Sequence, residues 1–227
     1  MKFLTPEQLE CLSALDSPTV ANAIEHFKLR DVTDGYMSME VPCLTPELSP
    51  MVGYAVTVTA DSTSPGAARP NAIQQLYNAV AASPKPVIVI IKDVGLNVAR
   101  SCHAGDNLCT LFQASGAVGL ITDGGIRDLA GIRANAPGFH VFARGLVVSH
   151  GNSYFLELGA TVSIGGLVIK PGDLLHADQN GVVSLPIDVV DGVIERAKAI
   201  IEKERHIISW AKSKDFDPAR VVETLSH

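Results

Sequence analysis

The sequence has few aromatic residues, few charged residues and no long apolar run. Aromatic residues make up 5% and charged residues 19% of the 227 positions, so an interior must be built mainly from Val, Ile, Leu and Ala. No apolar stretch approaches the roughly 20 residues that a membrane-spanning helix requires, and we therefore expect no membrane partner. The net charge is −6 and no basic run offsets it, which argues against binding to nucleic acid through its phosphates.

Cysteine is also scarce, and its spacing indicates neither a zinc site nor a redox motif. The four cysteines form no C-x-x-C pair, and none has zinc-finger spacing with a histidine. The chain opens without a signal peptide, so we predict the reducing cytoplasm. Cys102 lies close to the motif described below and could be a reactive thiol, but the role of a small buried hydrophobe is favoured.

What is present is a hydrophobic composition of 47%, which is enough for one sizeable core. Residues 52–60 are rich in β-branched side chains and 86–93 are almost continuously apolar, so both segments are predicted to be strands. Residues 146–186 contain short β runs separated by turns, and a long helix is predicted to follow and to end near residue 212. We find no internal repeat and no linker, so we predict one α/β domain over residues 1–227, with helices flanking it at both ends.

The centre of the chain contains two polar motifs separated by a short helix–strand unit. The first is Gly105-Asp106-Asn107-Leu108, and the second runs from Thr122 to Asp128; twenty residues lie between Asp106 and Arg127. Residues 107–115 can form a helix that Gly116 ends, and residues 117–121 form an apolar run of strand length. Such a unit returns the chain to its starting point, so we expect Asp106, Arg127 and Asp128 to lie near one another.

These residue types allow a functional and a structural interpretation. An arginine fork can grip a carboxylate, and paired aspartates suit Mg²⁺, which predicts metal-assisted handling of a small oxo-acid. Alternatively, an Arg-Asp pair can cap a helix, and Asp123-Gly124-Gly125 can be a turn after a strand. Residue types alone favour the structural interpretation, and the spacing does not decide between the two.

Several segments together resemble one family, the RraA-like proteins. The resemblance rests on 105–108, 119–128, 141–145, 164–173 and 178–186, in this order and with family-like spacing. It covers about residues 15–201, and the remainder, about 202–227, is a predicted helical tail. The family includes regulators of ribonuclease E activity and the class II 4-hydroxy-4-methyl-2-oxoglutarate and 4-carboxy-4-hydroxy-2-oxoadipate aldolases.

The resemblance implies a swivelling β/β/α-type fold assembled as homotrimers, or as hexamers of two trimers. It implies a lyase that depends on Mg²⁺ or Mn²⁺, cleaves 4-hydroxy-2-oxo acids to pyruvate through an enolate, and also decarboxylates oxaloacetate. Asp128 would be the metal ligand, and Arg127 would hold the oxo group or carboxylate of pyruvate. Gly105 and the N–H groups of Asn107 and Leu108 would bind the substrate carboxylate, while Asp106 would orient a metal-bound or catalytic water.

This sequence departs from the family pattern at three places. Gly131 stands where an acidic residue is frequent, and Asn22 stands where an Asp is frequent. A carboxylate from a neighbouring subunit supports the metal in the aldolases, and Glu202 and Glu204 are both candidates for it. These departures suggest an altered substrate or an enzyme that mainly decarboxylates. The alternative is a non-catalytic regulator that binds a ribonuclease; because regulators tend to lack the acid after the arginine, Asp128 favours the enzyme.

The remaining candidate residues are histidines and Asp123. The motifs contain no lysine, which argues against a Schiff base. His103 adjoins Gly105 and is a minority candidate for substrate contact, whereas His150 and His176 are expected to be structural. Asp123 is equally consistent with a turn residue and with a residue that orients the site.

Overall fold

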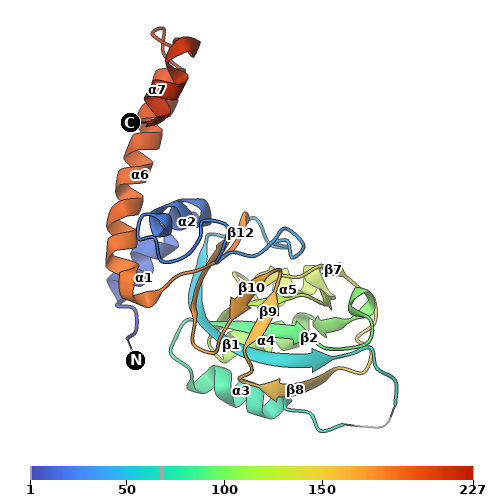
Figure 1. The fold of residues 1–227 in the computed structure, drawn as a ribbon. Coiled ribbons are helices and arrows are strands. Elements are labelled where there is room, and N and C mark those ends of the chain that lie inside the picture. Colours follow the sequence, from blue (N-terminus) through green and yellow to red (C-terminus); the bar gives the residue numbers. More distant parts are fainter. Residues whose placement is uncertain (1, 67–68, 227) are drawn as a thin grey trace.

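The computed structural model describes residues 2–66 and 69–226, and its centre is a curled, mixed sheet (Figure 1). The strand order is β12-β11-β1-β2-β4-β6, with β8 also pairing with β1. The long strand β1 pairs with β11 through its first residues and with β8 through its last, which gives the sheet its curl. The strands are β1 (Met51–Asp61), β2 (Val87–Asp93), β4 (Ala117–Thr122), β6 (His140–Phe142), β8 (Tyr154–Leu158), β11 (Leu174–Asp178) and β12 (Gly181–Ser184).

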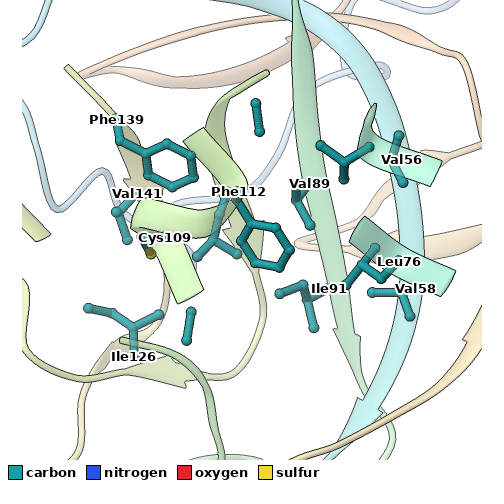
Figure 2. Packing of buried hydrophobic residues seen from close by; sticks show 14 of the residues in the cluster. Val56, Val58, Leu76, Val89, Ile91, Cys109, Phe112, Ile126, Phe139 and Val141 are labelled. Atoms are coloured by element: carbon teal, nitrogen blue, oxygen red, sulfur yellow. The ribbon is translucent and has the colours of Figure 1, made fainter. Parts of the chain in front are cut away.

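Strands β1, β2, β4 and β6 run parallel, with β1, β2 and β4 inside the sheet and β6 at its edge. The continuous apolar run in β2 is explained by burial on both faces, since residues 87–91 are fully buried. Val89 and Ile91 pack on one side, with helices α3 (Ile73–Ala82), α4 (Asp106–Ala114) and α5 (Leu129–Asn135). Figure 2 shows this side, where the Phe112 ring of α4 packs against β2. The hairpin β9 (Val162–Ile164) and β10 (Leu167–Ile169) packs on the opposite side.

The terminal helices pack against the antiparallel end of the sheet. Helix α1 (Pro6–Ser13) begins with a capping box formed by Thr5 and Gln8, and α2 (Ser17–Glu25) follows it. Both contact the long helix α6 (Val190–Ala211), which is preceded by a 3₁₀ turn. A turn at Asn180-Gly181 joins β11 to β12, with Asp178 opposite Gly181.

Only the first half of α6 belongs to the body of the molecule. Its fully buried residues are Val190, Val193 and Ala197, and the rest of the helix projects away from the sheet (Figure 1). Helix α7 (Val221–Ser226) folds back beside this distal half, where Trp210 and Phe216 have ring centroids 5.0 Å apart. The α6–α7 arm contains the predicted helical tail of about 202–227, although α6 itself begins at Val190.

The parallel strands end in acidic residues that gather at one edge of the sheet. Asp61 ends β1, Asp93 ends β2, and Asp123 directly follows β4; all three are buried. A small parallel sheet of β3 (Cys102–Ala104), β5 (Gly125–Ile126) and β7 (Gly145–Leu146) connects to this edge through the segments that follow β2, β4 and β6. In open α/β sheets, ligands bind outside the carboxyl ends of parallel strands, so this edge is where a site is expected.

Candidate functional site

The two central motifs meet through the small sheet. Ala104 pairs with Ile126, and the Arg127 N–H donates to the Ala104 carbonyl oxygen over 3.0 Å. Helix α4 begins directly after β3, and α5 begins directly after Arg127-Asp128. The helix and strand between the motifs therefore return the chain to its starting point, as the 20-residue spacing predicted.

Arg127 and Asp128 form an ion pair at the surface of this unit. Arg127 Nε lies 3.1 Å from Asp128 Oδ2, and the two side chains are 36% and 45% exposed. Asp128 has a φ of +55°, and Lys28 is the only other non-glycine residue in the described chain with a positive φ. A left-handed backbone is costly for most residues, although Asp tolerates it better than most, and such conformations gather at functional sites.

Gly105 allows this pair to approach the start of α4. A Cβ atom at position 105 would lie 3.0 Å from Asp128 Oδ2 and 3.2 Å from Arg127 Cγ. Few real Cβ contacts are this close, so any side chain here would push the pair outward. The glycine thus lets two charged side chains lie against a helix N-terminus, which itself favours negative charge.

The Asp106 carboxylate occupies part of that helix N-terminus. Its Oδ1 accepts from the Asn107 N–H over 2.8 Å, and its Oδ2 lies 3.4 Å from Asn135 Nδ2. No hydrogen bond among the described residues uses the Leu108 N–H. Of the two N–H groups assigned to substrate, one is free and the other is held by Asp106. Gly131 leaves room for Asp106, because a Cβ there would lie 3.0 Å from Asp106 Oδ2.

A cavity of about 80 Å³ opens beside Arg127 and the start of α4. Arg127 and the start of α4 form part of its wall, together with residues of β3. His150 and Ser153, from the loop before β8, complete the wall. His150, expected from the sequence to be structural, thus lies in the cavity wall. The sequence contained no signal for this contact, since the loop reaches the site through tertiary folding.

Behind the cavity lies a buried network of charged side chains. His103 Nε2 is 2.7 Å from Asp93 Oδ2, and the Asp93 N–H donates to Asp123 Oδ1 over 2.8 Å. Lys92 pairs with Asp123. Burial acts to raise the pKa of Asp93, but hydrogen bonding and charge from His103 outweigh it and hold the pKa below its ordinary value. Asp123 is therefore more than a turn residue, because it fixes the end of β2.

Lys92 and Cys102 both lie close to this unit in the folded chain. The fold brings Lys92 to the central unit although the motifs lack lysine, but Lys92 does not line the cavity. Cys102 is buried, its Sγ donates to the Ala104 carbonyl oxygen over 3.5 Å, and burial raises the pKa of its thiol. The favoured role of a buried hydrophobe is the one that this environment supports. His176 is structural as expected, held between Ser17 Oγ and the Leu12 carbonyl.

The donor set at the cavity fits a hard divalent cation. Asp106, at the start of α4, lines the cavity. Asp128, which precedes α5, does not line it, but its Oδ2 lies close to Gly105 at the start of α4 and its Oδ1 is free of hydrogen bonds among the described residues. The described chain contains no group of three or more His, Cys, Asp or Glu able to hold a metal. Mg²⁺ usually binds through one or two carboxylates and keeps several waters, so two carboxylates suffice for it. Glu202 and Glu204 lie on the projecting half of α6 and do not line the cavity of their own chain.

Comparison with known proteins identifies the family. The family model described as RraA-like, Aldolase/RraA, matches residues 17–184. The chain belongs to the RraA-like family. A protein of Halalkalibacterium halodurans, named provisionally as a 4-hydroxy-4-methyl-2-oxoglutarate aldolase, is 35% identical over 119 residues, which are 52% of this chain and 54% of that protein. An uncharacterised protein of Methanocaldococcus jannaschii is 38% identical over 96 residues, which are 42% of this chain and 45% of that protein. The chain thus spans about half the length of these curated relatives.

Solved structures confirm the predicted fold class. An uncharacterised protein from Pseudomonas syringae superposes with a TM-score of 0.73 at 22% identity, covering 95% of this chain and 92% of that one. Streptomyces coelicolor RraAS2 is described as an unusual member of the RNase ES inhibitor RraA protein family. It superposes with a TM-score of 0.66 at 21% identity, and the match covers 92% of this chain and 98% of that one. At these identities the likeness concerns the fold alone. No helix in the described part of this RraA-like chain is long and apolar enough to span a membrane.

Proposed function

We propose that this RraA-like protein is a metal-dependent lyase that cleaves 4-hydroxy-2-oxo acids of the 4-hydroxy-4-methyl-2-oxoglutarate type and decarboxylates oxaloacetate. Both reactions release pyruvate through an enolate. The observation that carries the proposal is the Arg127–Asp128 pair, 3.1 Å apart beside the start of α4, with Asp128 in a left-handed conformation. The family name and the aldolase-named relative support the same chemistry.

The roles of the chain's own residues follow from charge. A bound Mg²⁺ or Mn²⁺, held by Asp128, would supply Lewis-acid stabilisation of negative charge. Arg127 places a permanent positive charge where the enolate oxygen develops, which stabilises the transition state more than the ground state. The free Leu108 N–H and the helix N-terminus receive the substrate carboxylate. That carboxylate replaces Asp106 at the Asn107 N–H, and the released Asp106 can accept the C4 hydroxyl proton.

We further propose that the working unit is a homotrimer or a hexamer, in which a neighbouring subunit covers the site. Arg127 and Asp128 are more than one-third exposed, and an enolate is stabilised better where water is excluded. The projecting α6–α7 arm carries Glu202 and Glu204 beyond the body of its own chain, where another subunit could receive them. Sedimentation and mass photometry of the full chain would measure the assembly directly.

The experiment that tests the proposed reaction is pyruvate release from oxaloacetate and from 4-hydroxy-4-methyl-2-oxoglutarate. Release is measured through lactate dehydrogenase, with added Mg²⁺ and with excess EDTA. We expect activity with Mg²⁺ that EDTA abolishes and that fresh Mg²⁺ restores. Release that equals the protein-free background with both substrates, at every metal concentration, would refute the lyase.

A further inference from the structure

We infer that His103, held by Asp93, is a further catalytic residue that transfers the proton to and from C3 of the pyruvate enolate. The inference rests on the proposed lyase function and adds the proton carrier that this function requires. Arg127 is not suited to protonate C3 of the enolate. Asp106, which receives the C4 hydroxyl proton, is not suited to this step either. A neutral–cationic imidazole is the usual carrier for such a step near neutral pH.

His103 combines burial with access to the cavity. The residue is only 1% exposed, yet it forms part of the cavity wall together with Asp106 and Arg127. Strand alternation separates the two side chains of β3, because Ala104 packs into the core and the His103 ring lies on the opposite face, where it meets Asp93. Gly124 leaves space for the ring, since a Cβ at that position would approach His103 Nε2 to 2.7 Å.

The ring is oriented with one nitrogen bound and the other free. Nε2 faces Asp93 Oδ2 at 2.7 Å, while no hydrogen bond among the described residues involves Nδ1. Asp93 is itself fixed, because its Oδ1 accepts from the Gly95 N–H over 3.1 Å and its own N–H binds Asp123. Such a carboxylate–histidine pair holds the imidazole in one tautomer and stabilises it while it carries a second proton.

A purely structural role explains less of this arrangement. A buried ion pair is often no more stabilising than apolar side chains of similar volume. His176 uses both ring nitrogens on protein partners. His140 leaves Nδ1 unbonded but lies outside the cavity, whereas His103 leaves Nδ1 unbonded and belongs to the cavity wall. Among the three buried histidines of the described residues, only His103 combines an unbonded ring nitrogen with a place in the cavity wall, and this combination points to proton transfer.

Protonation of the enolate by His103 is a proton transfer and needs no oxidant or reductant. When the C3–C4 bond of oxaloacetate breaks, its electron pair forms the enolate of pyruvate and carbon dioxide leaves. The Nδ1 proton of the cationic imidazole then forms the new C3–H bond, and the ring becomes neutral with its Nε2 proton still directed at Asp93. Solvent returns the proton to Nδ1. The reverse transfer removes a methyl proton from bound pyruvate.

The reverse transfer supplies the test, because it exchanges the methyl protons of pyruvate with D₂O. Exchange is followed by proton NMR with the Mg²⁺-loaded full chain, beside oxaloacetate consumption by the same samples. In the variant His103→Gln, the amide can still donate to Asp93. We expect methyl exchange to fall at least about 100-fold and oxaloacetate consumption to fall less than about tenfold, since a released enolate can be protonated by water.

His140→Gln is the matched control, because His140 is also buried and bonds through Nε2, to the Ser49 carbonyl, but lies outside the cavity. We expect both of its rates to stay within twofold of wild type. Unchanged exchange in His103→Gln, while the wild type exchanges, would overturn the inference and leave the lyase standing. A wild type that neither exchanges nor consumes oxaloacetate would overturn both.

A second measurement does not depend on a folded variant or on turnover. The His103 Cε1–H signal of the wild-type protein is followed by NMR during titration with oxalate, a planar mimic of the enolate. We expect this signal to shift with occupancy and the His140 signal to stay in place. If oxalate moves the signals of Arg127 but not that of His103, the ring does not contact the ligand and the inference fails.

Discussion

Replacing Arg127 by Ala should remove activity while leaving the fold almost as stable as before. The Arg127–Asp128 pair is 3.1 Å long, but both side chains are more than one-third exposed. Exposed ion pairs contribute about 0–1 kcal/mol, because water screens the charges and ordering the side chains costs entropy. For a chain of this size, 1 kcal/mol corresponds to roughly 2–4 °C in Tm, so we expect a change no larger than that.

Arg127 should contribute far more to the rate of the reaction than to the stability of the fold. Removing one preorganised donor from a developing oxyanion costs about 10²–10³ in kcat, or roughly 3–4 kcal/mol. We therefore expect kcat/KM for oxaloacetate decarboxylation to fall by this factor in Arg127→Ala. Arg127→Lys should recover only part of the loss, since lysine keeps the charge but lacks the planar fork.

Arg133→Ala is the matched control for this experiment. Arg133 also carries an exposed ion pair, with Glu47 at 2.7 Å, and it lies on the adjacent helix α5 outside the cavity. Pyruvate release is measured with lactate dehydrogenase, and Tm by circular dichroism. Equal losses of activity in the two variants would contradict a catalytic role for Arg127. So would a Tm drop in Arg127→Ala large enough to explain its inactivity.

Three further predictions follow from packing and burial. Gly105→Ala should lower kcat/KM by about 100-fold with little change in urea midpoint, because its Cβ would displace the Arg127–Asp128 pair; Gly145→Ala, whose Cβ would enter open space, is the control. Phe112→Ala should cost about 3–5 kcal/mol of unfolding free energy, measured with urea, because the ring is fully buried between α4 and β2; a smaller loss would mean that the core collapses around the gap. Burial raises the pKa of Cys109 to about 12, so iodoacetamide at about pH 8 should leave it unmodified until urea is added, as mass spectrometry would show.

Regular segments of this fold could be predicted from the sequence because their signals are local. The apolar run of β2 and the period of the α4 segment each report a short stretch of backbone and the surface it buries. Gly116, with a φ of +98°, ends α4 where a left-handed residue is needed, as glycine allows. The spacing between Asp106 and Arg127 was also informative, because one helix and one parallel strand return the chain to its starting edge.

The remainder of the site could not be predicted because it depends on contacts between distant segments. Strands β5 and β7 contain two residues each, which is too short for any periodicity. His150 reaches the cavity from a loop that follows β7 by several residues, and Lys92 meets Asp123 because β2 and β4 pair side by side. Gly131, noted from the sequence as a missing acid, is explained only by the Asp106 carboxylate packed against it.

The polar residues of this edge divide into two layers with different physical consequences. The inner layer, formed by Lys92, Asp93, His103 and Asp123, is largely buried and already paired, so breaking it leaves an uncompensated buried charge that costs about 3–5 kcal/mol. The outer layer, formed by Asp106, Arg127 and Asp128, is partly exposed and weakly paired, so it can exchange its partners for a ligand at little cost. A rigid inner layer holds His103 in place, while the outer layer stays free to bind. Variants of the inner layer other than His103→Gln should therefore lose stability together with activity, and outer-layer variants should lose activity alone.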